Sequence, residues 1–234
     1  MRLVAALVLA ASAALAAAAS AASVDPARYD AFWLWAGVRP QPALAGAKRV
    51  YLLASEVRPG HPTRLIAQRP ATPRLTGPDV WMVVRVETLR WSPEVHRQLL
   101  ADVARWRSAG DRLTGVQIDF DARTRHLSEY AAFLADFRHE LPPDLRLGVT
   151  GLLDWSPNAD PAALDALVGV VDEMVVQTYQ GRHVIPNYER YLSGLSRLKI
   201  PFRIGLLQDS DWRAPPALAA NPRFRGYVVF LKNP

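Results

Sequence analysis

The feature that most constrains the fold is a regular alternation of strand-like and helix-like segments after residue 30. Eight short segments rich in β-branched and aromatic residues have the character of buried strands. They are Ala31–Gly37, Arg49–Ser55, Val80–Glu87, Gly115–Asp121, Leu147–Trp155, Glu173–Tyr179, Phe202–Gln208 and Gly226–Leu231. Because strand–helix–strand repetition requires parallel strands, eight of them predict a closed (β/α)₈ barrel of the TIM type.

Helix signals alternate with the strands from the third strand onward. Ser92-Pro93 combines an N-cap residue with a proline at the first helical position, and apolar residues then recur at helical spacing. A second helix is expected after Ser128, a third at Asp160-Pro161 and a fourth at Asn187.

The first third of the chain departs from this alternation. Only about ten residues separate the first two strands, which is too few for a crossover helix. The stretch Glu56–Asp79 contains five prolines and is expected to be a long loop, either a surface excursion or a cover over the barrel mouth. We therefore predict a barrel that is irregular in its first third.

Composition narrows the class of protein. The 234 residues contain no cysteine, which excludes disulfides, thiolate metal sites and a cysteine nucleophile. The net charge of +6 comes from scattered arginines and forms no basic tract, so no nucleic-acid partner is expected. The five histidines show no metal-ligand spacing, and no glycine-rich phosphate loop is present, so neither a metal nor another cofactor is predicted.

The first residues have the pattern of an export signal. Met1-Arg2 is a short positive start, Leu3–Leu15 is apolar, and Ser20 and Ala22 fit the small-x-small cleavage rule. We predict a signal peptide over residues 1–22, a single barrel domain over residues 23–234, and a periplasmic or secreted bacterial protein. The alternative is an uncleaved membrane anchor; no later segment is long and apolar enough to span a membrane. The sequence does not indicate an oligomeric state.

The fourth predicted strand, Gly115–Asp121, carries a row of polar side chains. Side chains alternate along a strand, so the apolar even-numbered residues should face the helices. Gln117, Asp119 and Asp121 should then face the barrel interior. Polar groups there are costly unless they pair with one another or serve a ligand. Catalytic residues of such barrels lie at the carboxyl ends of the strands, so this row is the main candidate site.

Polar and aromatic residues at the ends of other strands are expected to join this row. They are Trp35, Glu87, Asp154, Trp155, Gln177, Tyr179 and Gln208. Amides and carboxylates bind hydroxyl groups, and aromatic rings stack on the apolar faces of pyranose rings. The set therefore predicts a carbohydrate ligand or substrate.

The fourth strand also resembles a family signature. Thr114–Asp121 is similar to the Asp-Gly-x-Asp-x-Asp-x-Glu pattern of family 18 glycoside hydrolases, the chitinase-like barrels. Gly115 and Asp119 match, Gln117 replaces the middle Asp, and Asp121 stands where the catalytic Glu would be. In the sixth strand, Tyr179 is retained from that family's Met-x-Tyr-Asp motif.

Nearly the whole chain after residue 22 more closely resembles a bacterial family described as domain of unknown function 3142. The supporting segments are Val116–Ala122, Leu152–Trp155, Gln177–Arg182 and Gly226–Pro234. This resemblance implies a fold and brings no established activity.

Two functions follow, and the sequence does not decide between them. The first is an exported glycoside hydrolase-like enzyme that acts on a polysaccharide or amino-sugar glycan. Asp121 would be its acid, if its pKa is raised by burial or by a neighbouring carboxylate. By resemblance, Asp119 would orient an N-acetyl group and Tyr179 would hydrogen-bond to it. Alternatively, Asp121 would pair across the barrel with Glu87 or Asp154. The second function is a catalytically inactive barrel that binds carbohydrate or a partner in the cell envelope.

Overall fold

The computed structural model describes residues 22–233. The predicted signal peptide lies outside these residues, apart from Ala22. The strands are β1 (Ala22–Ser23), β2 (Ala31–Leu34), β3 (Arg49–Arg58), β4 (Arg64–Ala67), β5 (Asp79–Val86), β6 (Leu113–Asp119), β7 (Arg146–Leu152), β8 (Glu173–Gln177), β9 (Tyr179–Gln180), β10 (His183–Val184), β11 (Phe202–Leu207), β12 (Asp211–Trp212) and β13 (Phe224–Leu231). The α-helices are α1 (Pro93–Ser108), α2 (Leu127–Glu140), α3 (Trp155–Asn158), α4 (Pro161–Asp165) and α5 (Glu189–Leu192).

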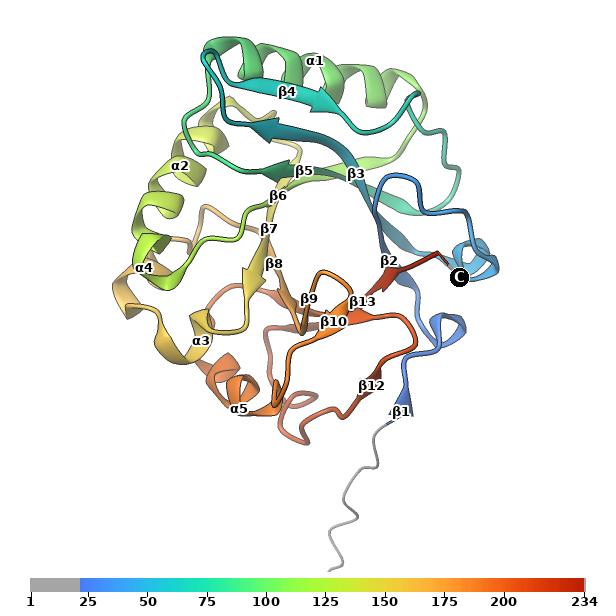
Figure 1. The fold of residues 1–234 in the computed structure, drawn as a ribbon, viewed down its shortest axis with the longest axis vertical. Coiled ribbons are helices and arrows are strands. Elements are labelled where there is room, and N and C mark those ends of the chain that lie inside the picture. The colour runs from blue at the N-terminus through green and yellow to red at the C-terminus, as the bar shows by residue number, and fades with distance from the viewer. Residues whose placement is uncertain (1–21, 234) are drawn as a thin grey trace, which may run out of the picture.

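Eight parallel strands form a closed barrel, as predicted. Their order around the barrel is β2-β13-β11-β8-β7-β6-β5-β3, and the pairing of β2 with β3 closes it. Figure 1 looks into the ring of strands and shows the helices outside it. All eight predicted strands are present, although several end earlier than expected; β6 ends at Asp119 and β7 at Leu152.

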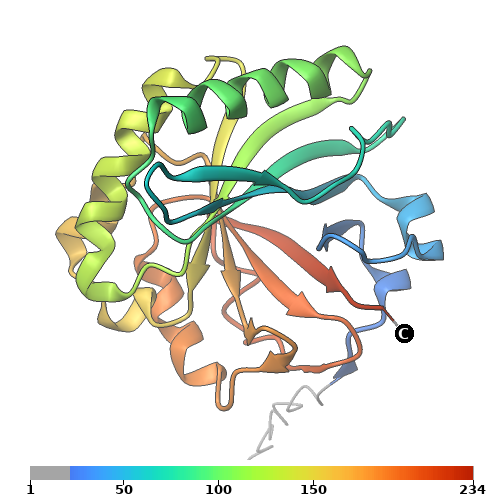
Figure 2. The same ribbon diagram turned by 45° about the horizontal axis from the view of Figure 1, so that its top comes forward.

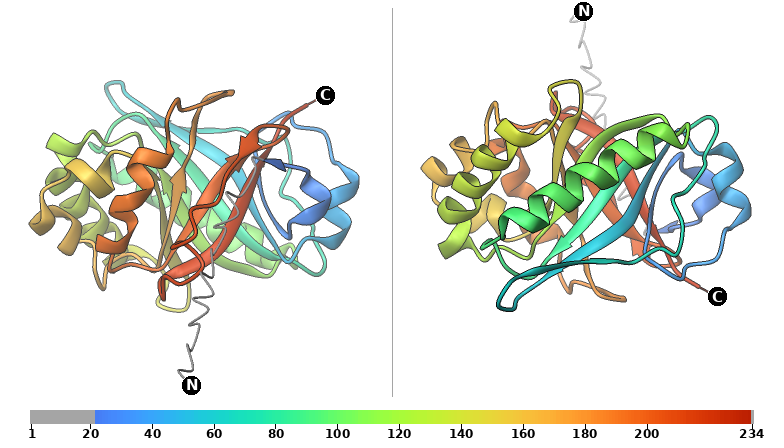
Figure 3. Two further views of the ribbon diagram at one scale, coloured as in Figure 1. Left: turned by 90° about the horizontal axis from the view of Figure 1, so that it is seen from below. Right: turned by 90° about the horizontal axis from the view of Figure 1, so that it is seen from above.

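The barrel is irregular in its first third. No α-helix follows β2 or β3; a 3₁₀ helix, Pro42–Gly46, lies between these two strands. Figure 3 shows α2–α5 on one flank of the barrel and the segment before β3 on the opposite flank. The expectation of an unstructured loop over Glu56–Asp79 is wrong in part, because β3 continues to Arg58 and pairs with the antiparallel strand β4 (Figure 2).

The helix signals read from the sequence are confirmed for α1 and α4. Pro93 opens α1, and its Val95, Leu99, Val103 and Trp106 are buried. In α4 the N-cap side chain, that of Asp160, accepts a hydrogen bond from a backbone N–H at 3.0 Å. The longer helices α1 and α2 each bury one apolar face against the sheet. These contacts determine which side chains of the strands point outward, toward the helices.

The inside of the barrel is a second, smaller core. It contains Trp33, Tyr51 and Trp81, and the last is fully buried. Gly115 and Gly148 leave room for this indole: a Cβ at either position would lie 2.7 Å from a ring carbon of Trp81. This packing fills the amino-terminal part of the barrel interior. The space for a ligand lies at the other end, where the strands have their carboxyl ends; we call this the upper end.

A buried ion network closes the amino-terminal end. Glu173 at the start of β8 accepts hydrogen bonds from Arg49 Nη1 at 2.9 Å, from Arg203 Nε at 3.0 Å and from the Tyr51 hydroxyl. Arg49 and Tyr51 belong to β3, Arg203 belongs to β11 and Glu173 to β8, so the network joins three strands across the amino-terminal end of the barrel.

Candidate functional site

A cavity of about 890 Å³ lies at the carboxyl ends of the barrel strands. This is the end at which (β/α)₈ barrels carry their functional groups. The cavity is lined by Trp33, Trp35, Glu56, Arg85, Asp119, Asp121, Arg123, Leu152, Leu153, Asp154, Gln177, Tyr179, Gln180, Gly181, Ile185, Tyr191 and Phe230. Residues from at least six barrel strands or the turns after them therefore meet around one space.

The fourth barrel strand, β6, has the alternation predicted from its sequence. Val116 and Ile118 belong to the outer core, between strands and helices. Gln117 and Asp119 point into the barrel and are 1% exposed. Asp121 follows the end of the strand and lines the cavity, where its side chain is 49% exposed. Solvent exposure thus falls along the polar row, from the half-exposed Asp121 to the buried Asp119 and Gln117.

Arg85, at the end of β5, joins the two aspartates. Its Nη1 lies 3.0 Å from Asp119 Oδ2 and its Nη2 lies 2.8 Å from Asp121 Oδ2. Burial disfavours the charge of Arg85, but the two carboxylates outweigh this effect and raise the pKa of the guanidinium. The register of the sheet explains the contact, because Arg85 is the direct partner of Asp119 on the neighbouring strand.

Asp119 is buried, and both of its carboxylate oxygens have partners within the protein. Its Oδ1 accepts a hydrogen bond from the Thr150 hydroxyl at 2.7 Å. Burial raises the pKa of the Asp119 carboxyl, while Arg85 and Thr150 act in the opposite direction. Burial also raises the pKa of the Tyr179 hydroxyl, with Asp119 adding to the effect, so Tyr179 remains a neutral phenol.

One wall of the cavity is aromatic. The Trp33 and Phe230 rings stack with centroids 5.2 Å apart, and the centroid of the Tyr179 ring also lies 5.2 Å from that of Phe230. Trp35, beside Trp33, is 37% exposed, and its ring lies 6.0 Å from the Arg85 guanidinium carbon. An exposed indole at the edge of a cavity is a surface on which a sugar ring can stack.

A β-bulge brings one further carboxylate into the cavity. Tyr51 and Leu53 of β3 face the barrel interior, so simple alternation would point Ser55 inward and Glu56 outward. The register with β5 shifts between Leu53 and Ser55, and Glu56 becomes the direct partner of Arg85. Glu56 therefore lines the cavity, a position that sequence alternation could not predict.

Asp154 lines the cavity from the turn between β7 and α3. Its Oδ1 atom is buried and has no hydrogen-bond partner among the described residues. Burial raises the pKa of this carboxyl, and a bond from its own backbone N–H only partly opposes the shift.

Six of the ten residues predicted for the site line the cavity. They are Trp35, Asp119, Asp121, Asp154, Gln177 and Tyr179. Gln117 lies below the floor of the cavity, where its Oε1 accepts a hydrogen bond from Trp33 Nε1 at 2.9 Å.

Three predicted site residues lie outside the cavity. Glu87 follows the end of β5 and is exposed. Trp155 is buried in the outer core, because the strand ends at Leu152 and the chain has already turned into α3; its indole N–H donates to the Ala122 carbonyl. Gln208 holds the C-terminal segment through the backbone N–H of Lys232.

Arg85, Glu56 and Arg123 are the charged residues of the cavity that sequence reasoning missed. Arg85 shares a strand face with Glu87, so alternation alone could have indicated it. For Glu56 the bulge removes that signal, and Arg123 lies in an irregular turn after β6, where no periodicity applies.

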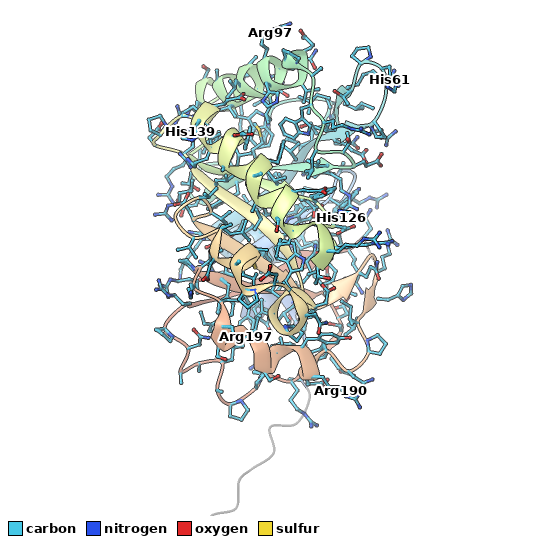
Figure 4. All side chains as sticks on the ribbon, turned by 90° about the vertical axis from the view of Figure 1, so that its left-hand side faces the viewer. His61, Arg97, His126, His139, Arg190 and Arg197 are labelled. Carbon is cyan, nitrogen blue, oxygen red and sulfur yellow. The ribbon has the colours of Figure 1, made fainter. Side chains whose placement is uncertain are left out.

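Over residues 22–233, no group of three or more His, Cys, Asp or Glu side chains is placed to hold a metal ion. Figure 4 shows His61, His126 and His139 well apart from one another on the outer surface. Within the same range no helix has the length and apolar character needed to cross a bilayer.

The fold is that of the chitinase-like (β/α)₈ barrels. The structure is similar to a xylanase–alpha-amylase inhibitor protein solved in complex with trehalose (TM-score 0.53, 12% identity, 89% of this chain and 93% of that one). It is also similar to a class V chitinase from Nicotiana tobaccum (TM-score 0.54, 11% identity, 80% and 67%). A third similar structure is the chitinase domain of a spore coat protein from Clostridium difficile (TM-score 0.51, 12% identity, 76% and 65%).

Residues 76–184 match the model of the family described as Domain of unknown function (DUF3142). The resemblance to this family seen in the sequence is thereby confirmed over this stretch, and the likeness to chitinase-like barrels is confirmed for the fold. No curated protein sequence matches the chain.

Proposed function

We propose that this protein is an exported barrel that binds a glycan in its upper cavity without cleaving it. The signal-like first residues support a place in the periplasm or outside the cell. The single observation that carries the proposal is the position of Arg85, which forms ion pairs with both acidic residues of the chitinase-like motif.

Glycoside hydrolysis requires a carboxylic acid that gives a proton to the leaving oxygen. Asp121 stands at the position of that acid, but it is half exposed and lies 2.8 Å from the Arg85 guanidinium. This ion pair has to break before Asp121 can carry and donate a proton. A carboxylate that is already bonded to an arginine is suited to accepting hydrogen bonds from sugar hydroxyls.

The rest of the cavity suits a sugar. Trp35 presents an exposed ring at the rim, while Gln177 and Asp154 offer amide and carboxylate groups to hydroxyls. Apolar walls with a few converging polar groups are typical of ligand sites. The similar inhibitor protein was solved with trehalose, which supports a carbohydrate ligand for this fold.

The test measures binding and cleavage on the same oligosaccharides. Oligomers of chitin, peptidoglycan and an exopolysaccharide are titrated by calorimetry and then analysed by mass after long incubation. We expect binding with no change in mass. Trp35→Ala should weaken binding at least about tenfold, ~1.4 kcal/mol, because it removes the stacking surface. Val168→Ala, which truncates an exposed apolar residue away from the cavity, is the control and should change nothing.

Hydrolysis is the second candidate, because Asp119, Asp121 and Asp154 line one cavity. By resemblance, Asp121 would act as acid once released from Arg85, and Tyr179 and Asp119 would position an N-acetyl group. Cleavage that disappears in Asp121→Asn, in a variant that still folds and binds, would establish this candidate and refute binding without turnover.

A further inference from the structure

The cavity has the opposite charge from the chain as a whole. The net charge of the sequence is +6, yet four carboxylates and two guanidiniums line the cavity. The carboxylates are Glu56, Asp119, Asp121 and Asp154; the guanidiniums are Arg85 and Arg123. Carboxylates therefore outnumber guanidiniums in the cavity, and an excess of negative charge in a concave site attracts cationic ligands.

These carboxylates differ in how far the protein neutralises them. Glu56 forms an ion pair with Arg58 at 2.6 Å. Asp119 and Asp121 share the single positive charge of Arg85. Asp154 forms no ion pair with any described residue, and its Oδ1 is buried without a donor. Asp154 is partly exposed and lines the cavity, so its charge is the one that a ligand can compensate.

We propose that the cavity selects glycans that carry a free, protonated primary amine, and that Asp154 binds this ammonium group. This inference rests on the proposed function, since it names the class of glycan that the same cavity takes. The ligand would be an amino sugar without its N-acetyl group.

An ammonium fits this place better than a hydroxyl. It has three N–H donors and no acceptor, so it can satisfy the Asp154 carboxylate without needing a donor in return. Its charge also offsets the excess of carboxylates, and a hydrogen bond between two charged groups is about twice as strong as a neutral one. The raised pKa of Asp154 is consistent with a carboxylate that lacks a counter-ion.

The aromatic wall is compatible with a cation. The Arg85 guanidinium already lies 6.0 Å from the centre of the Trp35 ring, at the edge of the cation–π range. The other ionisable groups facing the cavity are Glu56, Asp119, Asp121, Arg123, Tyr179 and Tyr191. Arg123 is exposed, so solvent and salt screen its repulsion of an ammonium.

The test compares three tetrasaccharides of the same linkage by calorimetry at pH 6 and low salt. They are the β-1,4-linked tetramers of glucosamine, N-acetylglucosamine and glucose. We expect the glucosamine tetramer to bind at least tenfold more tightly than the other two, and the difference to shrink as salt is added. Equal or tighter binding of the N-acetylated or neutral tetramer would overturn the inference while leaving glycan binding intact. No binding of any tetramer would count against both.

Matched variants locate the amine. Asp154→Asn keeps the shape and removes the charge, and should weaken the glucosamine tetramer about tenfold or more. It should change binding of the glucose tetramer less than twofold, which shows that the cavity still forms. Asp136→Asn removes a carboxylate from the exposed face of α2 and should leave both affinities unchanged. Unchanged glucosamine binding in Asp154→Asn would refute the assignment of Asp154.

Discussion

Arg85 forms two ion pairs that should differ greatly in energy, and this difference can be measured. The Asp119 side chain is 2% exposed and that of Asp121 is 49% exposed, although the two distances to Arg85 are 3.0 and 2.8 Å. Removing one partner of a buried pair costs about 3–5 kcal/mol, because it leaves an uncompensated charge. An exposed pair contributes about 0–1 kcal/mol. We therefore expect Arg85→Met to lower the free energy of unfolding by about 3 kcal/mol, almost entirely through Asp119.

Double-mutant cycles isolate the two contributions. Urea unfolding is measured for Arg85→Met, Asp119→Asn, Asp121→Asn and the two double variants that include Arg85→Met. Groups in direct contact couple by about 0.5–3 kcal/mol. The coupling of Arg85 with Asp119 should lie near the upper end of this range, and that with Asp121 at or below 1 kcal/mol. Equal couplings, or a larger one for Asp121, would refute the argument that burial rather than distance determines the strength of these pairs.

Three further perturbations test the packing, the ion network and the titration. Gly115→Ala places a Cβ 2.7 Å from two Trp81 ring atoms and 2.8 Å from the Arg146 carbonyl oxygen. Because this overpacks the barrel interior, it should lower the free energy of unfolding by about 2 kcal/mol or more. An unchanged urea midpoint would contradict this packing. Glu173→Gln leaves Arg203 without its carboxylate, while Arg49 keeps only the longer contact to Asp79 at 3.6 Å, and it should cost about 3 kcal/mol in urea unfolding. A loss below about 1 kcal/mol would mean that the network at the amino-terminal end is not buried in solution. Because burial raises the pKa of Asp154 above the usual 3.8, binding of the glucosamine tetramer should weaken on acidification, beginning at a higher pH than for an ordinary aspartate. Calorimetry across pH should show this loss in the wild type and not in Asp154→Asn; the same acid limb in both would exclude Asp154 as its cause.

The sequence predicted much of the barrel because its signals are local. Alternation within 115–121 placed Gln117 and Asp119 inside the barrel and Val116 outside it, and all three positions are confirmed. The predicted start of α1 at Pro93 is confirmed in the same way. These features depend on neighbours a few residues apart, so a single segment contains the information.

Where the observed positions differ from those expected from alternation, the causes are strand ends and register. The segment predicted as a strand up to Trp155 ends at Leu152, which leaves Asp154 in the cavity and turns Trp155 into the outer core. Glu56 enters through a bulge that alternation cannot reveal. In each case the position of the side chain depends on how the strand pairs with its neighbour and where that pairing ends. The sequence of the strand alone does not contain this information.

By itself the sequence determined eight strands, the barrel they close, and a polar row turned toward its interior, because side-chain alternation is a property of one strand. Only the tertiary structure decided which charged groups that row meets. The register between β5 and β6 sets Arg85 beside Asp119 and within reach of Asp121, and closure of the barrel gathers these groups with Asp154 and the aromatic wall. Charges that lie far apart along the chain compensate one another only after strands pair, so the ion pairs of Asp119 and Asp121 with Arg85 are fixed at that stage.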